Sequence, residues 1–160
     1  MREYATQMEA AKQGIITPEM KTVAEKEFTD PEIIRERVAL GQIAIPANIN
    51  HKSLCAEGIG KGLRTKINVN LGISGDANNY EAEMDKVRMA LRFGAEAIMD
   101  LSNYGKTNTF RQQLIELSPA MIGTVPMYDA IGYLEKDLLD ITAQDFLRLS
   151  GPTRKKGWIS

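Results

Sequence analysis

Residues 1–41 place apolar and polar side chains at the spacing of helices. Two of the expected helices begin with a capping residue, Thr17 or Asp30, and each cap is followed directly by a proline, an arrangement that favours a helix start. Glycine closes the first and third patterns. Helices are therefore predicted at residues 6–14, 17–27 and 30–41.

From residue 42 onward, short apolar runs alternate with amphipathic stretches. The apolar runs predict strands at residues 42–46, 65–73, 95–102 and 120–130. Helical periodicity predicts helices at residues 78–94, 107–119 and 134–150. Strands that alternate with helices imply a parallel sheet with helical crossovers. We therefore expect an α/β fold, with a helical segment at 1–41, β/α units at 42–150 and a separate tail at 151–160.

Three positions recur regularly along these units. Asn70, Met99 and Tyr128 each lie at or just past the end of a predicted strand, and 29 residues separate each from the next. A repeat of about this length is one β/α unit of a doubly wound sheet or of an eight-stranded barrel. Because both folds bind ligands where strands end, these three side chains are expected to point into one crevice.

Each of these positions also has a simpler interpretation. Asn68 and Asn70 share one side of a strand, where they either line a polar cavity or meet solvent at a sheet edge. Met99 could fill the core, and Tyr128 could be a packed aromatic residue whose hydroxyl has no ligand to contact. Asp100 stands at the mouth of the crevice or caps the turn that follows it.

Two loops offer weaker candidates. The segment "IPANINH" places Asn48, Asn50 and His51 after a proline, either as phosphate or ribose contacts or as a turn. The segment "EGIGKG" is glycine-rich but lacks the spacing of a phosphate-binding loop. A nucleophilic pair of Cys55 and His51 is formally possible, although a loop histidine and a small apolar cysteine explain both residues more simply.

Composition narrows the functional classes. The 160 residues are 43% hydrophobic and 26% charged with a net charge of −1, so nothing draws the chain toward nucleic acid or an anionic membrane. No apolar run is long enough to span a bilayer, and the charged start lacks a signal peptide's apolar stretch, so a cytoplasmic protein is expected. A single Cys permits no disulfide within the chain, and one Cys with one His cannot supply the three or four ligands of a zinc or iron–sulfur site.

Five segments, in this order and spacing, resemble the phosphomethylpyrimidine synthase family: "GIITPEM", "IPANINH", "KINVNLGIS", "GAEAIMDLS" and "SPAMIGTVPMYDA". The resemblance covers residues 5–150 and extends to a close relative, hydroxybenzimidazole synthase. It implies an eight-stranded β/α barrel, a [4Fe–4S] cluster, S-adenosylmethionine, zinc, and a radical rearrangement of 5-aminoimidazole ribotide. It also implies that Asn70, Met99 and Tyr128 contact this substrate.

Other parts of the family's pattern are missing from this sequence. The family's next substrate contact is a His in a "TIHAG" segment, followed by "SRG" and "DGLR" contacts, two zinc-binding His residues and a C-x-x-C-x-x-x-x-C motif, none of which occurs here. The segment "SNYGK" also departs from the "STG" common in pyrimidine synthases, which leaves the benzimidazole branch open.

The last ten residues, "GPTRKKGWIS", match no helix or strand pattern. The family would continue after "DFLR" with a segment such as "VVRAHAEEGVDFMTIHAG". With one choice of codons, deletion of a single G converts that continuation into this tail followed by a stop codon. We therefore expect an out-of-frame tail rather than a solvated basic one.

The sequence supports three hypotheses for the function of the whole chain. It is a truncated synthase that positions the ribotide for thiamine biosynthesis, a truncated paralogue that makes 5-hydroxybenzimidazole for a cobamide, or a non-catalytic fragment that binds itself or a partner through open edges. We expect no turnover by this chain alone and no cofactor bound to it. We also expect a homo-oligomer, with no nucleic-acid or membrane partner.

Overall fold

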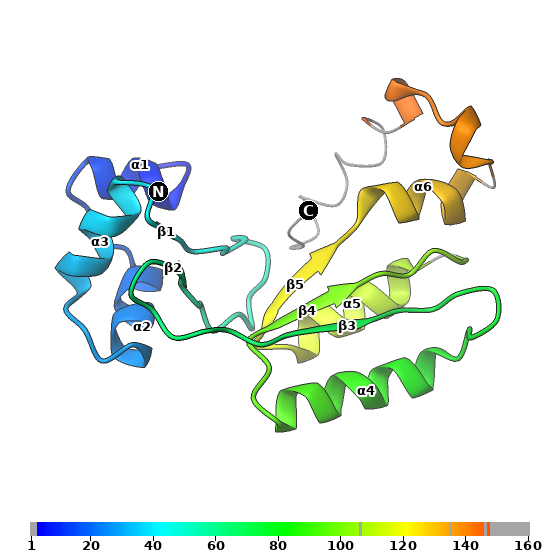
Figure 1. The fold of residues 1–160 in the computed structure, drawn as a ribbon, viewed down its shortest axis with the longest axis horizontal. Coiled ribbons are helices and arrows are strands. Elements are labelled where there is room, and N and C mark those ends of the chain that lie inside the picture. The colour runs from blue at the N-terminus through cyan, green and yellow to red at the C-terminus, as the bar shows by residue number, and fades with distance from the viewer. Residues whose placement is uncertain (1–2, 106, 135, 146, 148–160) are drawn as a thin grey trace. The chain divides into compact units, whose positions relative to one another are not determined.

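The computed structural model describes residues 3–105, 107–134, 136–145 and 147. The chain divides into two compact units, the first comprising residues 1–47 and 55–66 and the second residues 48–54 and 67–160. The predicted tail at 151–160 lies outside the described residues. Figure 1 labels the helices and strands of both units.

The first unit contains three short helices and a two-stranded antiparallel ribbon. Its elements are α1 (Gln7–Lys12), α2 (Pro18–Lys26), α3 (Pro31–Ala39), β1 (Ile43–Ala44) and β2 (Ile59–Gly60). All three predicted helices are confirmed, and their caps act as expected: Thr17 accepts a hydrogen bond from the backbone N–H of Met20 at 3.1 Å, and Asp30 accepts one from Glu32 at 2.7 Å.

Strand β2 explains the glycine-rich segment. A Cβ atom on Gly60 would lie 2.1 Å from the carbonyl oxygen of Gln42, so glycine is needed where the ribbon's two chains cross closely. The segment is therefore one strand of an antiparallel ribbon rather than a phosphate-binding loop.

Carboxylates and cations tie the first unit together next to its apolar core. Glu27 pairs with Lys66 and Arg64, while Glu57 pairs with Lys26 at 2.6 Å and with Arg64 at 3.4 Å. Burial alone would raise the pKa of Glu27. The hydrogen bonds from Lys66 and from the backbone of Arg64 outweigh burial, so this pKa lies below its usual value. These pairs hold the segment at residues 57–66 against α2.

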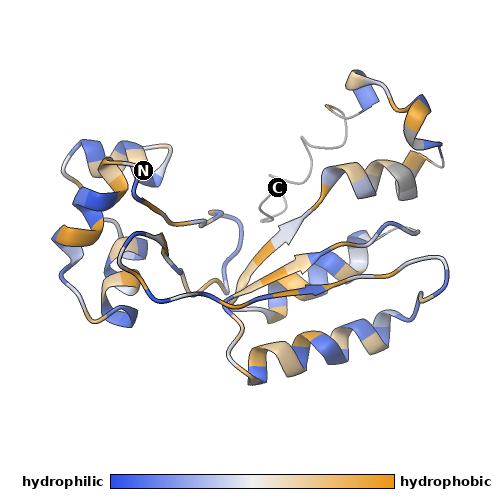
Figure 2. Ribbon diagram, viewed as in Figure 1, coloured by the Kyte–Doolittle hydropathy of each residue, from blue (hydrophilic) through white to orange (hydrophobic). Residues whose placement is uncertain are grey.

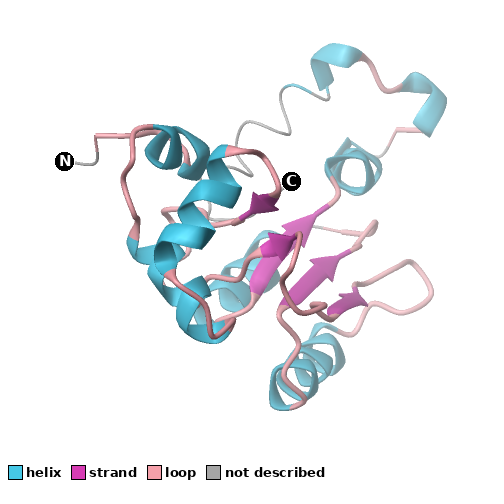
Figure 3. Ribbon diagram, turned by 60° about the vertical axis from the view of Figure 1, so that its left-hand side comes forward, coloured by secondary structure: helices cyan, strands magenta, loops and turns pink. Residues whose placement is uncertain are grey.

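The second unit is a three-stranded parallel sheet with helical crossovers. Its elements are β3 (Asn68–Leu71), α4 (Tyr80–Arg92), β4 (Ala97–Asp100), α5 (Asn108–Leu117), β5 (Met121–Thr124) and α6 (Pro126–Leu134), followed by a 3₁₀ turn at Leu138–Asp140. The strand order is β3-β4-β5, and the strands run in the same direction (Figure 3). The expected α/β class and its crossovers are confirmed. The described strands form an open sheet rather than a closed barrel.

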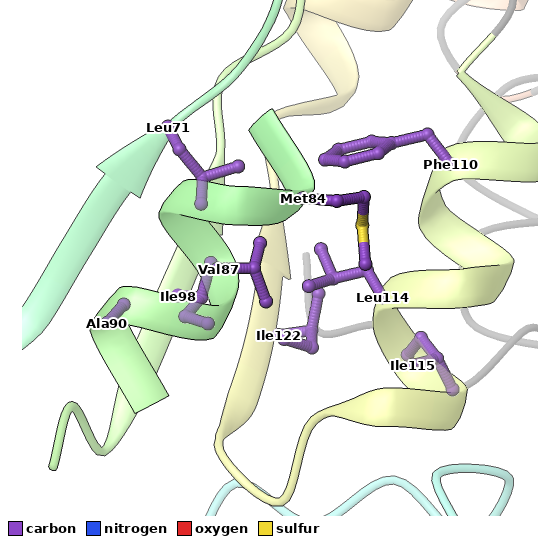
Figure 4. Close-up of a cluster of buried hydrophobic side chains, with 9 residues drawn as sticks. All are labelled: Leu71, Met84, Val87, Ala90, Ile98, Phe110, Leu114, Ile115 and Ile122. Atoms are coloured by element: carbon purple, nitrogen blue, oxygen red, sulfur yellow. The ribbon is translucent and has the colours of Figure 1, made fainter. Parts of the chain in front are cut away.

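Helices α4 and α5 cover one face of this sheet (Figures 1 and 4). Polar and apolar residues alternate along α4, as Figure 2 shows, and its apolar side packs on the strands. The core between helices and sheet contains Leu71, Met84, Val87, Ala90, Ile98, Phe110, Leu114, Ile115 and Ile122. This packing leaves the other face of the sheet for the candidate site.

The elements after Ala120 differ from the expectation in their bounds. The strand predicted at 120–130 ends at Thr124, and α6 begins at Pro126, because proline suits the first helical position and cannot donate to a strand ladder. The helical material expected at 134–150 is present in part: the described residues form the 3₁₀ turn at Leu138–Asp140 and are helical at 143–145.

Candidate functional site

Strand register places Asn70, Met99 and Gly123 side by side. Asn70 pairs with Met99 across β3 and β4, and Met99 pairs with Gly123 across β4 and β5. Because side chains alternate along a strand and Leu71, Ile98 and Ile122 face the helices, these three residues lie on the opposite face. We call Asn70, Met99 and Gly123 the site row.

Asn68 supports Asn70 on the same side of β3. The Nδ2 of Asn68 donates to the Oδ1 of Asn70 at 2.8 Å, and both side chains are exposed. No described acceptor contacts the Nδ2 of Asn70, so that amide retains two donors for a ligand. The sequence suggested a central strand here, but β3 is at the edge of the described sheet.

Met99 is half-buried and leans across its neighbouring strand. A Cβ atom on Gly123 would lie 2.1 Å from the Sδ of Met99 and 3.2 Å from its methyl carbon. The thioether therefore occupies the space that a side chain on Gly123 would fill. Met99 is on the sheet face away from the helices, so it does not fill the core between them.

Tyr128 does not share the site row. It lies in the first turn of α6, its backbone N–H donates to Val125 at 3.0 Å, and its side chain is 38% exposed. The second 29-residue step fails because Met99 pairs with Gly123, which is 24 residues further along the chain. Helix α5 has 10 residues against 13 in α4, and shorter connections account for the rest.

A buried polar network lies behind the site row, at the carboxyl ends of the strands. Asp100 accepts from the backbone N–H and hydroxyl of Ser102 and forms an ion pair with Arg111. Asp100 and Arg111 are 0% and 1% exposed. The Ser102 hydroxyl also accepts from the backbone N–H of Ile73 at 3.0 Å, so the network joins the ends of β3 and β4 to α5. Asp100 caps its turn, as one of the two interpretations proposed.

Sequence reasoning did not single out Arg111. The available signal was its position on α5, one residue after Phe110 and three before Leu114, both of which are buried. A cation within the apolar stripe of a helix indicates a buried partner, because an unpaired buried charge is costly.

The loop at residues 48–54 is anchored to the end of α5. The ring Nε2 of His51 lies 2.8 Å from the carbonyl oxygen of Ser118, and the Ser53 hydroxyl donates to the same oxygen at 2.9 Å. The backbone N–H of Asn50 donates to the side chain of Asn48, which confirms a turn. Burial lowers the pKa of His51, although its backbone hydrogen bonds oppose the shift. The His51 ring is thus engaged in structure, and Cys55 is a free, exposed cysteine.

A pocket of about 710 Å³ lies between this loop and α5. It is lined by Asn50, Lys52, Ser53, Asn108, Thr109, Gln112, Ile115 and Glu116. Asn50 is the one candidate from "IPANINH" that lines it; none of the site row does.

The described residues do not fit a metal cofactor. Within residues 3–105, 107–134, 136–145 and 147, no group of three or more His, Cys, Asp or Glu side chains could hold a metal ion. The sequence contains one Cys, whereas an iron–sulfur cluster takes three or four thiolates. No helix in the described ranges combines the length and apolar character needed to cross a membrane.

Comparison with known proteins gives consistent results. The family model described as "Radical SAM ThiC family" matches residues 6–157. Phosphomethylpyrimidine synthase of Alkaliphilus metalliredigens is 65% identical over 154 residues, which are 96% of this chain and 35% of that protein. The synthases of Clostridioides difficile and Finegoldia magna are 64% and 61% identical over 91% and 97% of the chain. The chain spans about a third of the length of these relatives, 34% and 36% for the latter two. The chain therefore belongs to the radical SAM ThiC family.

Proposed function

We propose that this chain forms part of the substrate-binding face of a phosphomethylpyrimidine synthase and positions 5-aminoimidazole ribotide. The observation that carries the proposal is the direct pairing of Asn70 with Met99 on the sheet face that the helices leave uncovered. The relatives that are 61–65% identical to this chain over the aligned residues carry the name of that synthase. Their names favour the thiamine pyrimidine over a benzimidazole product.

In this proposal the chain's own residues bind and orient. The free amide hydrogens of Asn70 donate to acceptors on the ribotide, and the Met99 thioether provides a polarisable apolar contact for its flat ring. Tyr128, near the start of α6, supplies a hydroxyl and an aromatic face. In the family a cluster and S-adenosylmethionine supply the radical chemistry. The described residues do not fit such a cluster, so no chemical step is assigned to this chain.

The same proposal places the second unit in a larger barrel. Its β3–α4–β4–α5–β5–α6 order, with parallel strands and helices on one face, is the repeating unit of an eight-stranded β/α barrel. The site row would then face the barrel interior. The out-of-frame origin of residues 151–160 stays a prediction. Sequencing the gene tests it, because restoring one base should open a reading frame into "TIHAG".

A binding titration of the 160-residue chain tests the proposal. We expect saturable binding of 5-aminoimidazole ribotide, measured by NMR or calorimetry. Asn70→Ala should weaken the affinity at least about tenfold, because the two neutral hydrogen bonds from the Asn70 amide are lost. Gln113→Ala is the matched control, since it removes an exposed carboxamide from α5 on the other side of the sheet. No saturable binding, or equal effects of both variants, would contradict the proposal.

A further inference from the structure

Gly123 occupies a position where strand geometry does not call for glycine. The φ angle of Gly123 is not positive, so alanine could adopt the same backbone conformation. Glycine inside a strand weakens the strand unless another group approaches closely. The group that approaches here is the side chain of Met99, whose Sδ lies within 2.1 Å of where a Cβ would be.

The direction in which Met99 leans follows from the strand order. Strand β4 lies between β3 and β5, so a Met99 side chain over Gly123 points toward β5 and away from β3. Asn70 is the partner of Met99 on β3. Neighbouring strands are only about 5 Å apart, so a long side chain can cover a residue on either neighbouring strand. In this structure Met99 leans over Gly123, and Asn70 stays exposed.

We propose that Gly123 is a positioning residue: it seats the Met99 thioether against β5 and thereby keeps the Asn70 carboxamide open to ligand. We call this position of the Met99 thioether over Gly123 the seat. The seat depends only on this chain's own conformation, and its effect on ligand binding rests on the proposed function. Gly123 acts through Met99, which has three rotatable side-chain bonds and readily takes another direction when its space is filled. A methyl group at residue 123 displaces Met99 toward Asn70.

The seat is tested first without any ligand. The chain contains eight Met residues, so methyl labelling with Met99→Ala as the assignment control isolates the Met99 signal. In the native chain we expect nuclear Overhauser contacts from the Met99 methyl to the Gly123 Hα. In Gly123→Ala that signal shifts, and contacts to the Asn70 side-chain amide appear. An unchanged Met99 methyl signal in Gly123→Ala overturns the proposal.

A double-mutant cycle, measured by melting temperature, separates the effect of the seat from a general effect of alanine on the backbone. Gly123→Ala should lower the melting temperature slightly, because the added methyl group forces the flexible Met99 side chain away from Gly123. The same change in a Met99→Ala background should cost nothing, because the clashing group is gone. Gly75→Ala is the control, since a Cβ there has its nearest atom at 3.8 Å on Tyr104 and its φ is not positive. An equal loss in both backgrounds overturns the proposal.

Titration with 5-aminoimidazole ribotide tests the consequence for ligand. We expect Gly123→Ala to weaken binding about tenfold, the cost of one obstructed hydrogen-bonding group, and to have no further effect in the Met99→Ala background. If the native chain does not bind the ribotide, the proposed function fails. The Met99 methyl contacts and the double-mutant cycle still test whether Gly123 positions Met99. Full ribotide affinity in Gly123→Ala, with Met99 displaced, refutes the link to Asn70.

Discussion

Asp100 and Arg111 form a fully buried ion pair directly behind the site row. Asp100 follows Met99 in the chain and pairs in register with Leu71, the residue after Asn70. The pair therefore anchors both backbones that carry the candidate ligand contacts. Taking two charges out of water is costly, and removing one partner leaves the other buried without compensation.

Arg111→Met should destabilise the second unit by about 3–5 kcal/mol, because it strands the Asp100 carboxylate in the protein interior. Urea unfolding followed by circular dichroism measures the loss. Asp100→Asn combined with Arg111→Met should recover part of it, since no buried charge remains.

Arg88→Met provides the matched control for this prediction. Arg88 also pairs with an aspartate, Asp85 at 2.5 Å, but both side chains are more than half exposed. Surface pairs contribute about 0–1 kcal/mol, so this variant should change stability little. Comparable losses in Arg88→Met and Arg111→Met would show that burial does not control the effect.

At the scale of elements, the carboxyl end of α5 depends on the loop at residues 48–54. The last carbonyl groups of a helix have no partner within it. The Ser53 hydroxyl donates to the carbonyl oxygens of Ile115 and Ser118, and the ring of His51 is hydrogen-bonded to the carbonyl oxygen of Ser118. This loop precedes the sheet in the chain, so only the folded structure brings the two together.

The lowered pKa of His51 makes this junction sensitive to pH. The folded state favours the neutral ring, so the unfolded chain takes up a proton at higher pH, near the usual value of 6.5. The free energy of unfolding should be fully retained above pH 6.5 and should fall as the pH drops through the lower pKa of the folded state. Urea unfolding between pH 7.5 and about 5 measures this.

His51→Gln is the control for the pH dependence. Gln can still donate to the Ser118 carbonyl but does not titrate, and His51 is the only histidine in the sequence. We expect the slope between pH 7 and 5.5 to flatten in the variant. An identical slope in both proteins would assign the effect to carboxylates instead.

At the scale of the whole molecule, the open sheet leaves an apolar edge. A groove beside β3 and α4 is lined mainly by apolar side chains, including Ile67, Val69, Met89 and Phe93. Phe93 is 80% exposed and Ile67 is 59% exposed. Unpaired strand edges and exposed apolar groups promote association between chains.

We expect the purified chain to exceed its monomer mass of 17.8 kDa in light scattering. Phe93→Lys with Ile67→Lys should shift the population toward monomer, since it places charge in the groove. Leu40→Lys is the control, because Leu40 is 71% exposed but belongs to the first unit. A monomer at all concentrations would contradict self-association through this edge.

Catalysis is also a property of the whole molecule. The chain covers about a third of its relatives' length and its described residues offer no cluster site. With cluster-reconstitution reagents, S-adenosylmethionine and 5-aminoimidazole ribotide present, we expect no product above the blank. Any product that depends on this chain would refute the prediction.

The sequence predicted most of the local structure. Caps, prolines and closing glycines predicted the three N-terminal helices, and period-two and helical patterns predicted β1 and the order of elements from β3 to β5. Strand β2 was not predicted. These signals act between residues close in the chain, so they can be read without a fold. They also identified Asn70 and Met99, because both sit where apolar strands end.

What the sequence could not predict depends on contacts between distant residues. Spacing alone assigned Tyr128 to the same row, but strand pairing put Gly123 there, since register depends on crossover length rather than on a constant repeat. Glycine carries no side chain to signal a role, and only the position of Met99 reveals what Gly123 does. The α/β class and two candidate residues were thus determined by the sequence itself, because periodicity and capping are local. The membership of the site row, the burial of Arg111 and the capping of α5 by His51 were decided by tertiary structure, because they depend on which distant groups pack together.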